Sequence, residues 1–437
     1  MVESQENYNH KAALTKQDLP EKFLYKKDKV ALVKLDDYEP ENVKRALKSL
    51  IRLLDIEDFF KRKSILLKPN VLASTKGAFT PTVFMEELIG IINEEKTVKE
   101  IFVGDSTITK KFTSVALKSS KIKEKSEAKG AKILNFFESE RIKIDLKKPI
   151  YHIEESIYLP KEVCEVDLVV NLPKLKTHGG FVYTGAIKNL FGLLGNKQKM
   201  HMTHIIKSDF QKMLADIYFA VEETNKTNFP KVLTIMDAVM AMEGKGPRGG
   251  DPRKVGLLIA GFNSAAVDII GYTLMNGNPG DLEVINSVAI RTELPVDISQ
   301  IDIVGDVDYK DYVIKDFKKP KVAMLKKRTI PDEGFTSKIR NKAMSISIKI
   351  NKNKCILCES CVKHCPAKAM ERKNEKIIID NNKCIECFCC GESCPNGAIS
   401  AKWFIFRIAP YLGLLVFVGG TMLIWLLILI IMKLLGL

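Results

Sequence analysis

The chain has 437 residues, 46% hydrophobic and 28% charged, a balance that excludes a disordered or collagen-like protein and leaves room for two or three domains. Its 68 Lys and Arg outnumber 53 Asp and Glu, and the net charge of +15 favours anionic partners: nucleic acid, phosphorylated substrates, an acidic protein or an anionic membrane surface. Nine of the ten Cys lie between Cys355 and Cys394, and the C-terminal end is almost wholly apolar. These two local features exclude a simple soluble enzyme.

The first 28 residues form a polar extension without the apolar core of a secretory signal, so we expect no export. From residue 29 to residue 314, apolar runs typical of strands alternate with helical stretches. We expect strands at 30–35, 64–70, 100–105, 131–136, 166–172, 232–238, 255–261 and 301–306, and helices that include 41–62, 82–95, 207–224 and 263–276. This alternation predicts an α/β domain with a mainly parallel sheet.

Polar clusters stand where several of these strands end, and ligands of open α/β sheets bind beyond the carboxyl ends of strands. The clusters are Lys68-Pro69-Asn70, Gly104-Asp105-Ser106, the run from Pro173 to His178, and Asp237 with the Gly-rich segment 243–247. Asp105 and Asp237 are candidate catalytic carboxylates, and helix caps or turn formers are the equally weighted alternative. Neither a GxxxxGK[ST] nor an HExxH motif occurs in the chain.

The segment 169–195 is the richest in candidate chemistry. It predicts a strand, then a basic loop with Lys174, Lys176 and His178, then a helix that carries Lys188. Three lysines that converge with the N-terminal end of a helix suit a phosphate or carboxylate ligand. His178 is a candidate acid/base or metal ligand, and a structural or solvated histidine is the even alternative.

The motifs LLKPNVL, VGDS, VVNLPKLKTHGGFVYTGAIKNLFGLLG and MDAVMAMEGKGPRGG resemble those of the family called domain of unknown function 362. The resemblance covers roughly residues 29–310 and is most specific over 173–192. It implies a redox context, because members of that family often carry an attached ferredoxin module, and it supplies no substrate. A more distant likeness to nickel-dependent lactate racemases, through fold, brings no nickel-site pattern to this chain.

A basic linker follows at 315–344, with 10 Lys and Arg against 3 Asp and Glu. Its only aromatic residues are Phe317 and Phe335, too few to favour nucleic-acid binding. Attraction to anionic lipid headgroups is the preferred interpretation, with a plain solvated linker close behind.

The cysteines of residues 345–400 form two runs, Cys355-x2-Cys358-x2-Cys361-x3-Cys365-Pro and Cys384-x2-Cys387-x2-Cys390-x3-Cys394-Pro. This spacing is typical of ferredoxins with two [4Fe–4S] clusters, in which the fourth Cys of each run crosses to the other cluster. The first cluster is therefore assigned to Cys355, Cys358, Cys361 and Cys394, and the second to Cys384, Cys387, Cys390 and Cys365.

An internal repeat supports the two-cluster assignment, since INKNKC at 350–355 recurs as IDNNKC at 379–384. Zinc binding and a disulfide framework are the weaker alternatives. Cys389, outside the pattern, is expected to be a structural thiol, and Cys164 a core residue.

Residues 408–432 are 25 consecutive residues without a charge, long enough at about 1.5 Å per residue to cross a hydrocarbon core of about 30 Å. The excess of Lys402 and Arg407 over Lys433 places the large N-terminal part in the cytoplasm. A buried core helix is the alternative. The chain thus divides into a polar extension (1–28), an α/β domain (29–314), a basic linker (315–344), a ferredoxin-type domain (345–400) and a single transmembrane helix region (403–433).

These features predict a membrane-anchored iron–sulfur protein, an oxidoreductase that passes electrons through two [4Fe–4S] clusters to an anionic substrate, phosphorylated or lipid-linked, or to a further centre on the α/β domain. The alternatives are a non-enzymatic electron-transfer or docking subunit of a membrane redox complex, and an anion- or nucleic-acid-binding protein with structural clusters. Expected partners are membrane lipid and an acidic electron carrier such as a ferredoxin, whereas nucleic acid is disfavoured. The sequence leaves open a flavin or further metal on the α/β domain.

Overall fold

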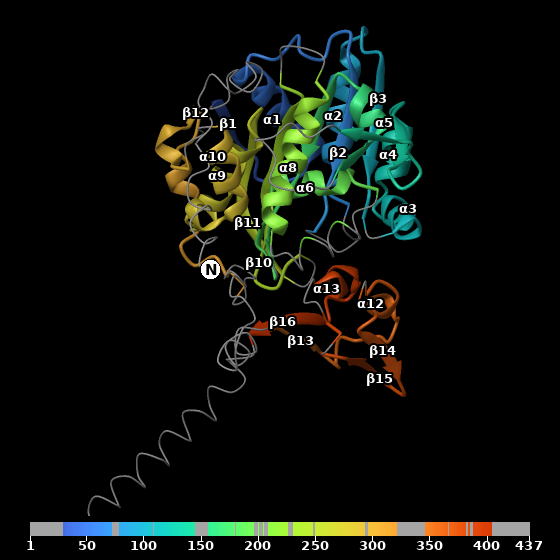
Figure 1. Cartoon of the computed structure of the whole chain (residues 1–437). Coiled ribbons are helices and arrows are strands. Elements are labelled where there is room, and N and C mark those ends of the chain that lie inside the picture. The colour runs from blue at the N-terminus through green and yellow to red at the C-terminus, as the bar shows by residue number, and fades with distance from the viewer. Residues whose placement is uncertain are drawn as a thin grey trace, which may run out of the picture.

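The computed structural model describes most of the chain from Lys29 to Trp403. The described residues are 29–71, 78–107, 109–144, 156–179, 181–195, 200, 204, 209–225, 230–247, 250–292, 296–320, 346–365, 367–381, 383–384 and 388–403. Figure 1 shows two parts, a large α/β domain and a smaller module that carries the cysteines and lies beyond one end of the large sheet.

The α/β domain is built on a ten-stranded sheet with the strand order β12-β1-β11-β10-β7-β2-β3-β4, and β8 and β9 lie off this path. These strands are β1 (Lys29–Lys34), β2 (Ser64–Pro69), β3 (Glu100–Asp105), β4 (Lys132–Asn135), β7 (Leu168–Leu172), β8 (Lys174–His178), β9 (Val182–Thr184), β10 (Val232–Glu243), β11 (Asp251–Gly261) and β12 (Asp302–Gly305). Neighbours are parallel from β10 through β7, β2 and β3 to β4, whereas β11 runs antiparallel to both β10 and β1. The prediction of a mainly parallel α/β sheet is confirmed, with antiparallel pairing at β11 and between β8 and β9.

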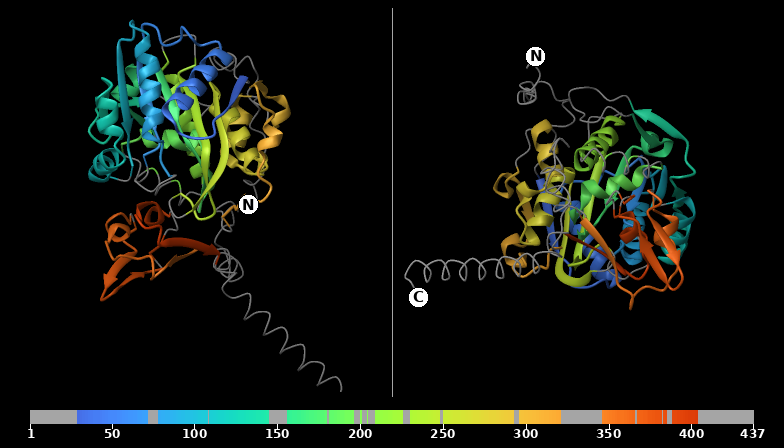
Figure 2. Two further views of the ribbon diagram at one scale, coloured as in Figure 1. Left: turned by 180° about the vertical axis from the view of Figure 1, so that it is seen from behind. Right: turned by 60° about the horizontal axis from the view of Figure 1, so that its bottom comes forward.

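Helices cover both faces of this sheet (Figures 1 and 2). One face packs on α1 (Pro40–Leu53), α2 (Thr82–Glu94), α3 (Lys110–Ser119) and α4 (Ile122–Glu127). The other packs on α6 (Ala186–Leu190), α8 (Phe210–Glu223), α9 (Ser264–Leu274) and α10 (Glu283–Thr292). The central strand β7 is buried throughout, and β2 is buried from Ile65 onward, because both faces of each strand meet helices. This explains why their sequences are continuous apolar runs.

Two segments differ from the expectation. The helix predicted over 41–62 ends at Leu53, and Asp55 after it adopts a left-handed backbone with φ of 57°. The predicted basic loop from Lys174 to His178 is the strand β8, which pairs with the second half of the long strand β10. Its basic side chains are buried: Lys174 pairs with Asp237, and Lys176 donates to Asn70 and to the carbonyl of Ala78.

The smaller module repeats one unit twice. Its elements are β13 (Ile346–Ile350), α12 (Ser360–Lys363), β14 (Met370–Lys373), β15 (Lys376–Ile379), α13 (Cys389–Ser393) and β16 (Ile399–Trp403). The first strand, β13, pairs antiparallel with the last, β16, and β14 pairs with β15 as a hairpin. The helices α12 and α13 face the α/β domain, while the hairpin lies on the far side (Figures 1 and 2).

Within the part of the chain that the structure describes, no helix is long and apolar enough to cross a bilayer. The predicted transmembrane helix lies outside the described residues from residue 404 onward, and so does most of the basic linker.

Candidate functional site

A buried ion pair closes the carboxyl ends of β2 and β3. The Nζ of Lys68 lies 2.8 Å from Oδ1 of Asp105, and the other carboxylate oxygen of Asp105 accepts from the backbone N–H of Val71 at 2.9 Å. Burial lowers the pKa of Lys68, and the carboxylate of Asp105 opposes that shift. The turn at Gly192 covers the pair so closely that a Cβ there would come within 2.4 Å of Asp105 Oδ1. This part of the site is therefore packed rather than open.

An amide network lies beside this ion pair. Lys176 Nζ donates to Asn70 Oδ1 at 2.7 Å and to the carbonyl of Ala78 at 2.9 Å. Asn70 donates to Asn189 Oδ1 at 2.8 Å, and Asn189 donates to Asn171 Oδ1 at the same distance. The chain of amides joins β8 to the residue that follows β2, to α6 and to β7. It brings Lys176 of β8 and Asn189 of α6 into one buried polar cluster.

A second buried ion pair joins Lys174 to Asp237. Their Nζ–Oδ2 distance is 2.7 Å, both side chains are 1% exposed, and Tyr38 completes a triad. Lys174 donates to the Tyr38 hydroxyl at 2.7 Å, and that hydroxyl donates to Asp237 at 2.9 Å. Burial lowers the pKa of Lys174, and burial together with Asp237 raises the pKa of Tyr38. The triad fixes the loop before α1 to the sheet.

His178 ends β8 and is fully buried. Its Nδ1 accepts a hydrogen bond from the backbone N–H of Phe181 at 3.2 Å, so the neutral ring carries its proton on Nε2. The ring lies 5.0 Å from the ring of Phe181 and 6.1 Å from that of Phe388, which belongs to the cysteine module. Lys188 is half-buried, with Nζ 5.6 Å from the Phe181 ring.

The start of α6 holds an internal carboxylate. Asp268 of α9 accepts from the backbone N–H groups of Ala186 at 2.5 Å and Ile187 at 3.0 Å, and from the Tyr183 hydroxyl at 2.8 Å. Burial raises the pKa of Asp268 to about 6, against the lowering effect of these hydrogen bonds. Asp268 thus occupies the place where the sequence predicted a ligand anion.

The structure thus brings the six predicted residues of the α/β domain to one edge of the sheet, but not into one open site. Asp237 pairs with Lys174, and Asp105 pairs with Lys68. Lys176 and His178 lie on β8, and Lys188 lies on α6. Sequence reasoning missed Tyr38 because 199 residues separate it from Asp237, and nothing in its local sequence marks it. Asn171 was also missed, since a lone Asn inside an apolar strand has no distinctive pattern.

The Gly-rich segment Gly244–Pro247 joins the antiparallel strands β10 and β11. A dinucleotide site needs the Gly-rich turn between a strand and a helix, so this segment does not build one.

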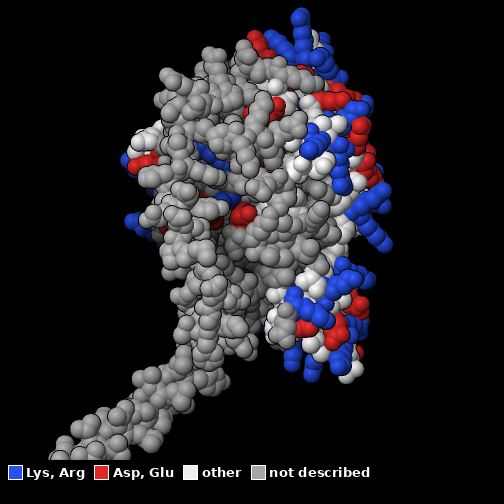
Figure 3. Space-filling model, in the orientation of Figure 1, with Lys and Arg blue, Asp and Glu red and all other residues white. Residues whose placement is uncertain are grey.

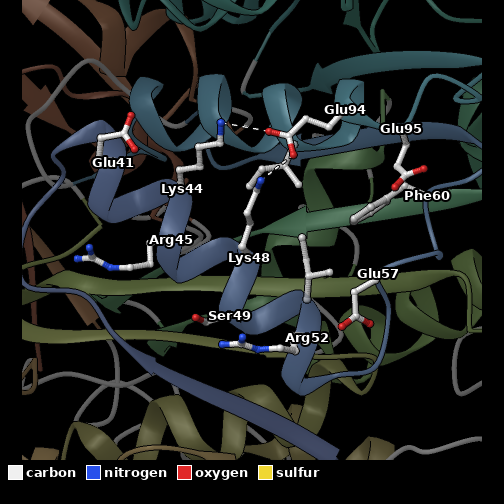
Figure 4. A pocket seen from close by; sticks show the side chains of 12 residues that line it. Glu41, Lys44, Arg45, Lys48, Ser49, Arg52, Glu57, Phe60, Glu94 and Glu95 are labelled. Atoms are coloured by element: carbon white, nitrogen blue, oxygen red, sulfur yellow. Dashed lines mark ion pairs between the residues drawn. The ribbon is translucent and has the colours of Figure 1, made fainter.

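A wide surface hollow of about 650 Å³ lies between α1 and α2 (Figure 4). Lys44 and Lys48 cross it to Glu94, at 3.1 and 2.7 Å. None of the predicted site residues lines it.

The cysteine module brings together the first predicted cluster set. Cys355, Cys358, Cys361 and Cys394 line one small cavity, although Cys394 is distant from the other three in sequence. Burial raises the pKa of Cys361 to about 11, and the thiols of Cys394, Cys358 and Cys355 add to the shift. The backbone N–H of Ala398 donates to Cys394 Sγ at 3.2 Å, as suits a thiolate ligand. These residues fit a [4Fe–4S] cluster.

Within the described residues, no three His, Cys, Asp or Glu side chains converge closely enough to hold a single metal ion. A single zinc ion needs four ligand atoms around one point, at about 2.3 Å for sulfur. A cubane cluster takes one thiolate at each of four iron atoms, so its ligands stand around a cavity, as they do here.

The second predicted set is described in part. Cys365, Cys384 and Cys390 pack in the same apolar cluster of the module, and Cys387 lies outside the described residues. The backbone N–H of Ala369 donates to Cys365 Sγ at 3.2 Å, matching the bond to Cys394 in the first set. Cys389, the thiol outside the pattern, is buried at the start of α13.

The module touches the α/β domain through residues that adjoin the second set. Phe388, between Cys387 and Cys389, packs on the turn of His178 and Gly179. His364, just before Cys365, lies edge-on to Phe112 of α3 with 5.8 Å between ring centroids. The second cysteine set therefore lies against the polar edge of the sheet.

Comparisons with known proteins match the α/β domain and the cysteine module separately. Residues 65–273 match the family described as domain of unknown function (DUF362), and residues 347–395 match the 4Fe-4S dicluster domain. A thylakoid-associated protein of Synechocystis sp. is 28% identical over 303 residues, which are 68% of this chain and 88% of that protein. The lactate racemase apoprotein of Thermoanaerobacterium thermosaccharolyticum aligns with 12% identity and a TM-score of 0.36, over 58% of each chain. The chain thus contains a DUF362 domain and an iron–sulfur domain of the dicluster type, which supports a part in electron transfer.

Proposed function

We propose that this protein is a membrane-anchored iron–sulfur oxidoreductase in which two [4Fe–4S] clusters serve an acceptor at the polar edge of the α/β sheet. One observation carries the proposal: Phe388, inside the second cysteine run, packs on His178 and Gly179 at the end of β8. The bound clusters supply one-electron transfer. The protein supplies a fixed contact between the cluster-binding loop and the buried polar groups of the sheet.

The acceptor is an anionic molecule, phosphorylated or lipid-linked. Of the three lysines that the sequence assigns to its binding, Lys174 is already neutralised by Asp237. The other two lysines of the proposal are Lys176, which donates to Asn70 in the amide network, and Lys188, next to Asn189 of that network, with His178 as proton donor through Nε2.

The membrane anchor is the uncharged segment 408–432. The strand β16 ends at Trp403 and is paired with β13, so the cysteine module extends to within five residues of that segment. At about 3.5 Å per residue at most, this tether holds the module within about 17 Å of the anchor. The description of the Synechocystis relative as thylakoid-associated supports a place at a membrane.

A second candidate is a non-enzymatic electron-transfer or docking subunit of a membrane redox complex. It is favoured by the internal pairing at the polar edge, where Asp105, Asp237 and Asp268 already satisfy Lys68, Lys174 and the start of α6. Such a packed edge suits a structural role as well as a binding role.

Anaerobically purified protein tests both candidates. Iron and sulfide analysis, EPR of the dithionite-reduced form and cofactor extraction come first, and about eight iron atoms per chain are expected. Reoxidation of the reduced protein by a panel of phosphorylated and lipid-linked metabolites is then compared with that of His178→Ala. Loss of reoxidation with iron content unchanged supports the oxidoreductase; indifference to this substitution favours the docking subunit; zinc in place of iron contradicts both.

A further inference from the structure

The two halves of the cysteine module are repeats, but equivalent positions differ in burial: one packs on the α/β domain and the other lies at the surface. Glu359 and Phe388 occupy equivalent positions 29 residues apart, and each precedes a short helix with a left-handed backbone, φ 57° and 63°. Phe388 is 4% exposed and packs on the α/β domain. Glu359 is part-exposed and pairs with Arg372 at 3.1 Å. The same backbone position therefore makes a docking contact in one half and remains at the surface in the other.

The cysteine loop of the first half has a solvent-exposed part around Cys358. Cys358 is exposed, and Ile356 beside it is 62% exposed, the kind of apolar side chain that proteins normally bury. Lys352 and Lys354, from the turn before Cys355, are also exposed. On the face of the molecule that Figure 3 shows, Lys and Arg side chains of the module lie among Asp and Glu side chains. An apolar centre with a basic rim has the composition of a protein-docking surface.

We infer that this surface, formed by Lys352, Lys354, Ile356 and Cys358, docks a small acidic one-electron carrier protein. The inference rests on the proposed function in taking the cysteine sets to be redox centres. The carrier gives up one electron and this protein gains it, with no transfer of atoms or protons. The first cysteine set, which includes Cys358, thus faces the carrier, and the second set, which includes Cys390, faces the α/β domain. The occupant is acidic because the rim lysines attract negative charge, and it is a protein because Ile356 offers an apolar contact.

Binding of an acidic bacterial 2[4Fe–4S] ferredoxin to the full chain in detergent, measured by calorimetry at low and high salt, tests this surface. The double variant Lys352→Glu/Lys354→Glu and the single variant Ile356→Ser are each expected to weaken binding about tenfold or more. The matched controls are Lys376→Glu and Ile378→Ser on the β14–β15 hairpin, where Ile378 is 41% exposed. Ile377 lines the cysteine cavity, and Ile378, the next residue of the strand, lies on the opposite side. Ile378 is therefore a control that does not line the cavity.

Weaker binding by the test variants alone, together with weaker binding at high salt, supports the inference. Equal effects in test and control variants, insensitivity to salt, or no binding of the ferredoxin overturns it. These binding measurements involve no turnover, so they can support the docking surface even if the protein has no enzymatic activity. Conversely, a result that overturns the docking surface does not contradict the proposed oxidoreductase function.

A second measurement uses the unaltered protein. Iron is removed in part with an iron chelator under anaerobic conditions and without an oxidant, and the released thiols are alkylated with iodoacetamide and identified by mass spectrometry. Cys355, Cys358, Cys361 and Cys394 are expected to be labelled before Cys365, Cys384, Cys387 and Cys390. The reason is that Cys358 of the first set is exposed, whereas Cys365 and Cys384 of the second set are part-buried and Cys390 is buried. Labelling in the reverse order, or of both sets together, contradicts the assignment of the outer set.

Discussion

The ring of Phe388 lies 3.2 Å from the position that a Cβ on Gly179 would take, and its centroid lies 6.1 Å from that of His178. This contact joins the cysteine module to the end of β8. It depends on a glycine on one side and an aromatic ring on the other, and it aligns the second cysteine set with the buried polar edge of the sheet.

Enlarging Gly179 is expected to weaken this contact. In Gly179→Val the added side chain meets the Phe388 ring, so the thermal midpoint should fall, and Phe388→Ala should restore part of the loss by removing the ring. The coupling between the two substitutions should be about 1 kcal/mol, measured as a double-mutant cycle by anaerobic thermal unfolding. Glu359→Ala, at the equivalent position of the exposed half, is the matched control and should show no coupling with Gly179→Val. Strictly additive effects of Gly179→Val and Phe388→Ala would show that the ring does not seat on Gly179.

The crossed cysteine assignment makes a sharp prediction about iron content. Cys394→Ser and Cys355→Ser, 39 positions apart, should remove the same centre, because both thiols line one cavity. Each variant should fall from about eight to about four iron atoms per chain and leave the same residual EPR signal. Cys365→Ser should leave the other signal. If Cys355→Ser and Cys365→Ser gave matching residual spectra, each run would hold its own cluster.

Breaking the buried pair of Lys174 and Asp237 should be costly. Lys174→Met leaves the carboxylate of Asp237 buried at 1% exposure without its cation, and such losses cost about 3 to 5 kcal/mol. Denaturant unfolding measures the change. Glu94→Gln, which breaks the exposed pairs to Lys44 and Lys48, is the control and should cost less than about 1 kcal/mol. A loss for Lys174→Met no larger than that of the control would mean that water reaches the triad.

Substitution by alanine should change the stability of the protein in opposite directions at Gly192 and at Gly90. A Cβ at Gly192 would come 2.4 Å from Asp105 Oδ1 and 2.7 Å from Lys68 Nζ, so Gly192→Ala should displace this pair and destabilise the protein by about 1 to 3 kcal/mol. Gly90, inside α2, has nothing within 4 Å of such a Cβ, and Gly90→Ala should stabilise by about 0.5 to 1 kcal/mol. Thermal unfolding of the two variants should show midpoints on opposite sides of the parent. A shift of both midpoints in the same direction would contradict the packing of the turn on the ion pair.

The strands were the most predictable part of the molecule, because burial on both faces makes β2, β3 and β7 continuous apolar runs that end at polar residues. The cysteine sets were equally predictable, since a cluster imposes its spacing on the sequence. The state of the lysines was not predictable: Lys174 and Lys176 were predicted on a basic loop that binds an anion, yet Asp237 and Asn70, far away in sequence, accept their hydrogen bonds inside the protein. The docking role of Phe388 was also hidden, because only the fold shows that Gly179 leaves room for its ring.

Asp268 should make stability depend on pH between its unfolded and folded pKa values. Burial raises its pKa from 3.8 to about 6, so in this window the folded protein holds the proton more tightly than the unfolded chain. The contribution of Asp268 to folding stability is therefore most favourable below the pKa of the unfolded state, and it is lost as the pH rises through the folded pKa of about 6. Asp268→Asn cannot titrate, so it should become more stable relative to the parent by up to about 3 kcal/mol as the pH rises from about 4 to about 7. Chemical unfolding of both proteins across this range measures the difference, with the exposed Asp306→Asn as control. A difference that does not change with pH would mean that the hydrogen bonds from Tyr183, Ala186 and Ile187 outweigh burial and keep Asp268 ionised throughout.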